Sequence, residues 1–153
     1  MKNIQSFSGM LNRGFRGNVT YNLRLPSGIT ALSVTLTHNK ERIQNREAYL
    51  ERYGSELLPV LNSYLGRNAS RQELEHYTAS MKTEIQLGLT VGGEFAGNVH
   101  MPGEQKKIYI SAAEASRGCL PCSHLEGMAK IIVHVFQVVE DGTAYSLEVK
   151  GDF

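Results

Sequence analysis

The chain has 153 residues, of which 41% are hydrophobic and 20% charged, and its formal net charge is +1. This length and composition fit a single globular domain over residues 1–153, with enough apolar mass for a core that needs no disulfides. No apolar run follows Met1, and none reaches the length of a membrane span. We therefore expect a cytoplasmic protein with reduced thiols that is neither secreted nor held in a membrane.

Two stretches near the N-terminus alternate apolar and polar side chains. The first runs from Val19 to Leu25 and the second from Leu32 to Thr37, on either side of Pro26-Ser27-Gly28. A period of two is typical of half-buried strands, and Pro and Gly favour a turn. The pattern predicts an N-terminal β-hairpin.

The hydrophobic period changes to that of a helix after Asn39, which is a candidate N-cap. Apolar residues recur at helical spacing over residues 43–64, and Gly66 ends the run. We expect Gly54 and Pro59 to break or bend this helix, because proline lacks the amide hydrogen that an internal turn requires.

A second helix and three strands are predicted in the middle of the chain. The helix begins with a capping box, in which serine is followed three residues later by glutamate. Turn signals then separate stretches that again have a period of two. The predicted elements are a helix starting at Ser70-Arg71-Gln72-Glu73 and strands over 85–91, 94–101 and 107–111, joined at Gly92-Gly93 and Pro102-Gly103.

Two further capping boxes begin at Ser111 and Ser123, on either side of the two cysteines. They predict short helical turns there. Residues 130–139 and 144–150 are rich in β-formers and flank Asp141-Gly142, so they predict a C-terminal hairpin.

The predicted order is a hairpin, two helices, three strands, a short helical excursion and a hairpin. Runs of strands around a helical block predict an α+β fold with a largely antiparallel sheet. In its element order the chain resembles sensor domains of the PAS and GAF type. By analogy, this resemblance implies a sheet that carries a ligand pocket or a dimer face.

The most chemically concentrated stretch contains both cysteines and one histidine, in the order C-x-x-C-x-H. Cys119, Cys122 and His124 are residue types that bind zinc. A structural zinc site needs a fourth ligand, for which His134 and His100 on predicted strands are the candidates. The sequence therefore predicts a candidate zinc site in this stretch.

The same stretch has other interpretations. Its C-x-P-C form is used by thioredoxin-like proteins, but that fold has a cis-proline downstream and no proline follows Cys122. A redox switch outside that fold stays open. In zinc deaminases the histidine precedes the P-C-x-x-C segment, so the order here excludes that class. A Cys122 nucleophile with a histidine base also stays open, as does a structural role in which both cysteines pack as small apolar residues.

Residues 1–40 include five lysines and arginines and no acidic residue. Such a region could bind nucleic acid weakly, or it could be an ordinary solvated surface.

No complete catalytic constellation is visible in the sequence. The leading prediction is a non-catalytic domain that binds a small ligand or a protein partner and forms a homo-oligomer through a helix or an edge strand. The alternative from another class is a cysteine- or zinc-dependent enzyme centred on Cys119, Cys122 and His124. No cofactor other than zinc is expected.

Overall fold

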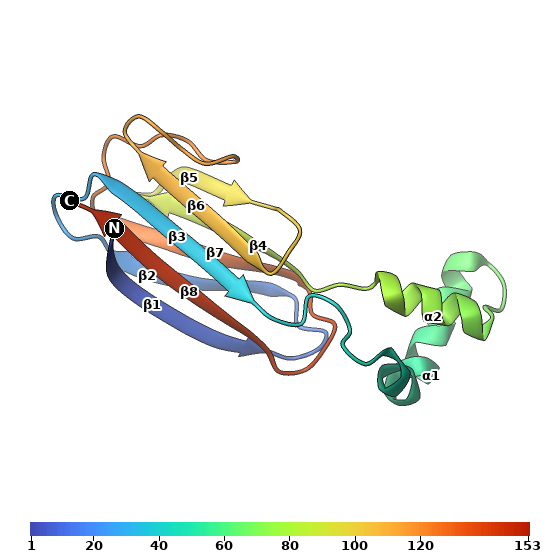
Figure 1. Cartoon of the computed structure of the whole chain (residues 1–153). Coiled ribbons are helices and arrows are strands. Elements are labelled where there is room, and N and C mark those ends of the chain that lie inside the picture. The colour runs from blue at the N-terminus through green and yellow to red at the C-terminus, as the bar shows by residue number, and fades with distance from the viewer.

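The computed structural model describes all 153 residues. It contains eight strands and two helices, and the strands form two antiparallel sheets that stack face to face (Figure 1). The first sheet has the order β1 (Lys2–Leu11), β8 (Thr143–Asp152), β3 (Ala31–His38) and β6 (Gln105–Ser111). The second has the order β2 (Gly17–Arg24), β7 (Met128–Gln137), β4 (Glu84–Val91) and β5 (Glu94–Val99).

The strand pairing is that of a jelly roll. Strand β1 pairs with β8, β2 with β7, β3 with β6 and β4 with β5, all antiparallel. The chain thus folds back on itself as one long antiparallel ribbon, which wraps so that alternate pairs lie in opposite sheets. Successive strands therefore lie in opposite sheets except at the β4–β5 turn, and the helices lie within one of these crossings, between β3 and β4.

Most predicted strand positions are confirmed, but the predicted N-terminal and C-terminal hairpins are both wrong. Strands β2 and β3 lie in different sheets, and so do β7 and β8. Only β4 and β5 pair directly, through Gly92-Gly93. A period of two shows which side chains face inward, but it does not show which strand lies alongside. The mixed α and β content is confirmed. The PAS and GAF analogy is not, because the strands form two stacked sheets.

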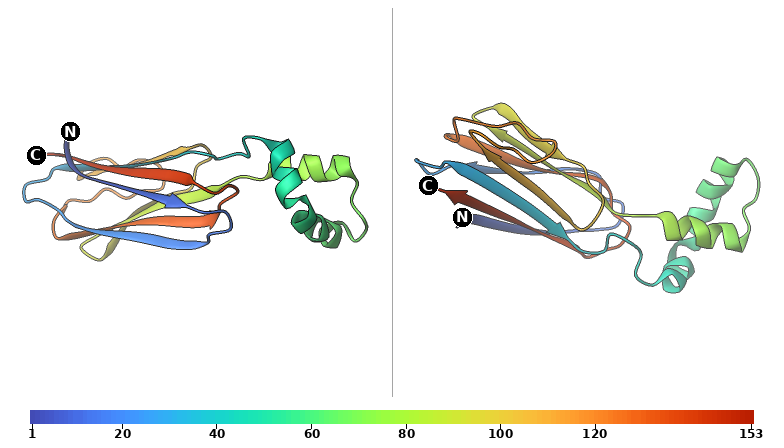
Figure 2. Two further views of the ribbon diagram at one scale, coloured as in Figure 1. Left: turned by 90° about the horizontal axis from the view of Figure 1, so that it is seen from below. Right: turned by 45° about the horizontal axis from the view of Figure 1, so that its top comes forward.

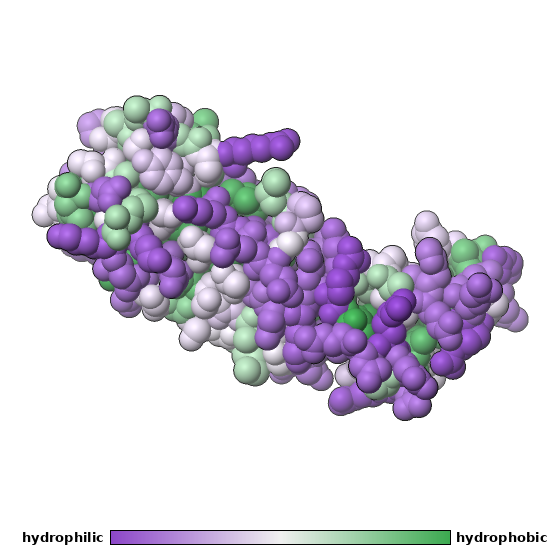
Figure 3. Space-filling model, in the orientation of Figure 1, coloured by the Kyte–Doolittle hydropathy of each residue, from purple (hydrophilic) through white to green (hydrophobic).

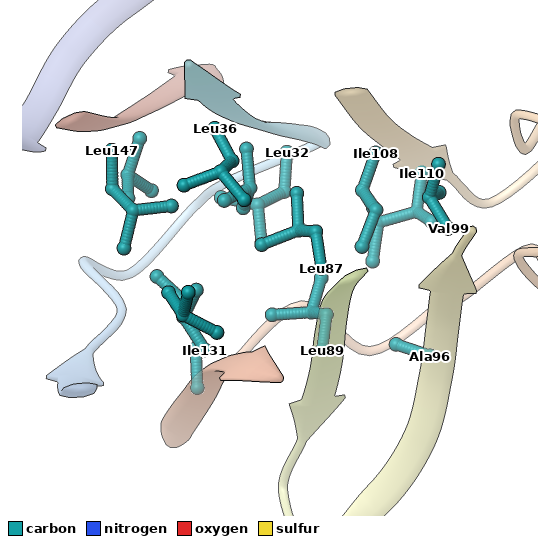
Figure 4. Close-up of a cluster of buried hydrophobic side chains, with 14 of the residues drawn as sticks. Leu32, Leu36, Leu87, Leu89, Ala96, Val99, Ile108, Ile110, Ile131 and Leu147 are labelled. Carbon is teal, nitrogen blue, oxygen red and sulfur yellow. The ribbon is translucent and has the colours of Figure 1, made fainter. Parts of the chain in front are cut away.

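The main core lies between the sheets, where alternate residues of each strand face one another (Figure 4). A cluster of 23 buried residues fills this space. Burying one leucine or isoleucine side chain contributes about 1.5–3 kcal/mol, so this cluster dominates the stability of the fold. Its fully buried members include Leu32, Leu36, Ile108, Ile110 and Leu147 of the first sheet and Leu87, Leu89, Ile131 and Val133 of the second.

Aromatic side chains close the side of the sandwich at which β1 and β2 are the edge strands. The rings of Phe7 and Tyr21 stack with their centroids 4.5 Å apart. The hydroxyls of Tyr21 and Tyr145 share a hydrogen bond of 2.7 Å between the two sheets. Strand β1 itself was not predicted, because an edge strand with a bulge between Asn3 and Gln5 lacks a clean alternation.

The two helices form a hairpin inserted between β3 and β4 and project beyond one end of the sandwich (Figures 1 and 2). Helix α1 (Arg46–Leu65) begins at Asn45, whose side chain accepts the Ala48 N–H at 3.1 Å. The predicted N-cap at Asn39 is therefore wrong. Gly66 ends the helix in a left-handed conformation, as predicted. Neither helix is both long and apolar enough to cross a membrane.

Helix α1 runs without interruption through Gly54 and Pro59, so of the predicted break or bend the break is wrong. Pro59 and Ser55 both lie on the exposed side of the helix, where water can bond the carbonyl oxygen that proline leaves without a partner. Helix α2 (Arg71–Ser80) begins with the predicted capping box of Ser70 and Glu73.

The root of the hairpin consists of two segments that pair with each other. Arg42 and Lys82 form an antiparallel bridge, and the Thr83 N–H donates to the Glu41 carbonyl at 2.8 Å. The two ends of the insertion therefore lie side by side, so the jelly roll is continuous across it.

Arg13, in the loop after β1, fastens the hairpin to the sandwich. Its Nε donates to the Tyr49 hydroxyl at 3.0 Å, and its guanidinium pairs with Glu56 at 3.2 Å. The same group lies 3.8 Å from the ring centroid of Tyr53. These three contacts join one side chain to three residues of α1.

We expect Arg13→Ala to loosen the hairpin while leaving the sandwich folded. Hydrogen bonds to a charged group contribute about 1.5–3 kcal/mol to stability. Amide exchange in α1 and α2 should therefore become faster, because local opening of the hairpin costs less free energy by this amount. Exchange in β3, β7 and β8 should stay slow. Arg46→Ala, at the start of the same helix, is the control and should change neither. Equal acceleration in the core strands would contradict this role for Arg13.

Candidate functional site

Both cysteines lie in the loop that joins β6 to β7. This loop contains turns and bends but no helix, so the helical turns predicted from the boxes at Ser111 and Ser123 are wrong. Ser111 Oγ does accept the Glu114 N–H at 3.0 Å. The chain then turns back to β6, where the Ser116 N–H donates to the Tyr109 carbonyl at 2.9 Å, instead of continuing as a helix.

The loop closes the side of the sandwich at which β5 and β6 are the edge strands. Its Leu120 N–H donates to the Ala96 carbonyl of β5 at 2.9 Å, and its Cys122 N–H donates to the Ser111 carbonyl of β6 at 2.9 Å. The segment that contains the cysteines therefore binds the edges of both sheets. Edge strands need such cover, because their unpaired backbone groups otherwise attract other chains.

Both thiols are free and half-buried, and both pack against the main core. Cys119 Sγ lies 3.4 Å from Ser116 Oγ. It also lies over Gly97, where an added Cβ would come within 2.5 Å of the sulfur. These contacts favour the structural interpretation of the cysteines over the redox and nucleophile interpretations.

The structure does not bring the predicted zinc ligands together. The Cys122 thiol lies 3.4 Å from the His124 backbone oxygen, not from its ring. His134, on β7, bonds through Nδ1 to Asn18 at 2.9 Å, and His100 lines a cavity at the hairpin root. No group of three or more His, Cys, Asp or Glu side chains is placed to hold a metal ion. The zinc site stays a prediction.

A second candidate site, missed from the sequence, is a cavity of about 220 Å³ at the hairpin root. Lys106 lines it and is only 3% exposed. The Lys106 ammonium donates to the Gly103 carbonyl and to His38 Nε2, the latter at 3.2 Å. His38 is also buried, and its Nδ1 donates to the Asn39 carbonyl at 2.9 Å. His38 is therefore a neutral ring held in one tautomer.

Burial lowers the pKa of both Lys106 and His38, because the charged forms lose their hydration. Glu41 and Glu104 oppose this effect at Lys106, and Lys82 adds to it. Neither carboxylate touches the lysine, which takes part in none of the ion pairs of the chain. The alternation of β6 contains a signal for this site, since it places Lys106 on the same face as Ile108 and Ile110.

A third candidate site lies along the helical hairpin, where a cavity of about 530 Å³ opens between the helices. Leu61, Tyr64 and Leu65 of α1 and Tyr77 of α2 supply its apolar lining. Tyr64 is 87% exposed beside it. Figure 3 shows hydrophobic residues among hydrophilic ones on the surface of the hairpin.

Comparison with known proteins gives a family but no function. The match is to a family of unknown function (DUF6669) and extends over residues 1–152. No curated protein matches the chain. The jelly roll itself occurs in proteins of many unrelated functions, so the fold carries no assignment either.

We expect Gly97→Ala to expose the Cys119 thiol. The added methyl group would overlap the sulfur, and overpacking of this kind costs about 1–3 kcal/mol. Local opening of the loop should become easier, and alkylation of Cys119 in the native protein should be about tenfold faster. Gly88→Ala is the control, because its methyl group meets His134 on the outer face of the same sheet. Unchanged alkylation in the Gly97 variant would show that the loop does not depend on this contact.

His38 should make the protein less stable in mild acid. Its pKa in the folded state is lowered from 6.5, so the unfolded chain binds the proton more tightly. The stability that neutral His38 contributes is complete above pH 6.5 and is lost as the pH falls through the lowered folded value. Urea unfolding at pH 7.5 and 5 should show a smaller loss for His38→Gln than for wild type. His76→Gln, on the exposed side of α2, should lose as much stability at pH 5 as wild type. An equal loss in wild type, His38→Gln and His76→Gln would show that His38 is not the cause.

Proposed function

Because the chain belongs to the DUF6669 family, whose function is unknown, we propose its function from the geometry. The chain is a non-catalytic interaction domain in which a rigid jelly roll carries a helical hairpin, and the hairpin binds a second copy of the chain. The observation behind this proposal is the hairpin face that no part of the protein covers.

The hairpin buries one of its faces and leaves the other open. Six of its residues, including Leu57, Leu61 and Leu74, form a small core together with Val139 of the connection between β7 and β8. Val60 and Tyr64, on the open face of α1, are 57% and 87% exposed. Two helices alone do not enclose a core, and a helix as short as the ten residues of α2 is marginal in water. A partner on the open face would supply the missing layer.

The shape of the open face supports a second copy as that partner. Tyr64, on the lining of the cavity between α1 and α2, is largely exposed. A two-fold axis would place the Tyr64 ring of each protomer in the cavity of the other, which makes the patch complementary to itself. Two hairpins paired in this way form a four-helix bundle, in which each hairpin gains the layer it lacks.

The charges on the hairpin do not oppose self-association. Residues 43–81 include four arginines and five glutamates, so the two hairpins would be nearly neutral. Two of the arginines already pair within the protomer, Arg67 with Glu73 at 2.8 Å and Arg71 with Glu75 at 3.1 Å. Little repulsion therefore arises when two copies meet.

The basic N-terminal region gives less support to nucleic-acid binding. Three of its five cationic side chains are engaged within the protein: Arg13 with the hairpin, Arg16 Nε with the Phe136 carbonyl at 2.9 Å, and Lys40 with the Asp141 carbonyl at 2.8 Å. The alternative of a cysteine-dependent enzyme likewise lacks support, because both thiols pack against the core.

We expect wild-type protein to form a concentration-dependent dimer in analytical ultracentrifugation. Val60→Glu and Tyr64→Ala should each weaken it at least tenfold, which corresponds to about 1.4 kcal/mol. Phe95→Ala is the matched control, because Phe95 on β5 is as exposed as Val60, at 57%. A wild-type monomer at all concentrations, or an equal loss in the control, would contradict the proposal.

A further inference from the structure

We propose that the cavity at the hairpin root binds a small oxyanion, a carboxylate or a phosphate, and that Lys106 is its main ligand. This inference is independent of the proposed dimer, because the cavity lies within one protomer. It rests on two buried donors, the Lys106 ammonium and the Thr83 hydroxyl, that line the same cavity and retain hydrogen-bonding capacity.

Lys106 offers the cavity a proton and an uncompensated charge. Its ammonium has three N–H donors, of which His38 Nε2 and the Gly103 carbonyl accept two. The third has no acceptor in the protein. A lysine residue that is 3% exposed and forms no ion pair is costly to hold in its charged form. A bound oxyanion would supply both the missing acceptor and the opposite charge.

The carboxylates around the cavity do not fill this role, because each has another partner. Glu41 Oε1 accepts the Gly103 N–H at 2.7 Å. Glu84 pairs with Lys82 at 3.4 Å. Glu104, close to the lysine but outside the cavity lining, accepts the Glu41 N–H at 3.2 Å. None of the three carboxylates forms an ion pair with the Lys106 ammonium.

Thr83 supplies the second buried donor. Thr83 is one of the residues that line the cavity, and it is 2% exposed. The hydroxyl oxygen accepts the Val139 N–H at 3.2 Å and makes no other hydrogen bond. The hydroxyl proton is therefore available to an oxygen atom in the cavity.

The size and rim of the cavity define the class of ligand. Its volume of about 220 Å³ is below the roughly 300–1,000 Å³ of pockets for drug-sized molecules, so a nucleotide does not fit. His100 also lies on the lining and offers a further hydrogen-bonding group, whereas the Lys82 charge is paired with Glu84. The arrangement suits a small anion with two or more oxygens. Lys106 would neutralise its charge, and the Thr83 hydroxyl would donate to its second oxygen.

The test is a titration of the full-length protein with inorganic phosphate and, separately, with acetate. Ionic strength is held constant with sodium chloride, and the amide resonances of Gly103, Thr83 and Lys106 are followed by NMR. We expect saturable shifts at these amides with at least one of the two anions. The anion that saturates identifies the site as one for phosphate or for carboxylate. No saturable shift with either anion would overturn the proposal.

Three variants assign the binding to the proposed donors. Lys106→Met keeps the length of the side chain but removes its charge, and should weaken binding at least tenfold. Thr83→Val should weaken it severalfold, and it keeps the proposal testable if the Lys106 variant fails to fold. Lys107→Met is the control, because Lys107 is the exposed neighbour on β6 and should leave binding unchanged. Equal weakening by Lys107→Met would show nonspecific attraction to surface charge and refute the site.

Discussion

The packing of one sheet face against the other is the constraint on which the rest of the structure depends. It fixes the inward positions of every strand, and it places Lys106 and His38 inside simply because they follow the alternation of Ile108 and Leu36. It also leaves two open sides, one closed by aromatic residues around Tyr21 and the other by the loop that contains the cysteines. The hairpin lies beyond the end of the sheets and cannot share their core. It relies on six buried residues of its own, which cluster with Val139, and on the Arg13 contacts.

This arrangement changes the interpretation of the segment that contains the cysteines. As an isolated motif, C-x-x-C-x-H suggests metal or thiol chemistry. In the fold, its backbone binds the edges of β5 and β6, and its sulfurs cover the seam between the sheets. The hairpin root is the better candidate for a binding site, because a buried lysine and a buried threonine line one cavity there. The two segments that connect the hairpin to the sandwich pair at this root. Glu41, Lys82 and Thr83 therefore belong both to these segments and to the candidate anion site.

Features decided by local interactions could be predicted from the sequence, whereas those decided by long-range pairing could not. The capping box at Ser70 and the glycine that ends α1 involve only neighbouring residues, and both are correct. Asn39 and Asn45 are equally good caps by residue type, and tertiary contacts select the second. The strands of a jelly roll pair with partners far along the chain, so adjacent strands with a turn between them resemble a hairpin without forming one. Lys106 is followed by a second lysine, Lys107, and such a pair suggests the protein surface until the alternation of β6 is taken into account.

The central claim is that the jelly roll is complete without the hairpin and that the hairpin is the element of association. The most direct measurement replaces residues 43–81 with Asn-Gly, which can turn the chain between the paired residues Arg42 and Lys82. Circular dichroism, urea unfolding and ultracentrifugation of this variant then follow its fold and its mass. The account predicts a cooperatively folded β-protein that stays monomeric at concentrations where the wild type dimerises. An unfolded chain, or one that dimerises as strongly as the wild type, would contradict it.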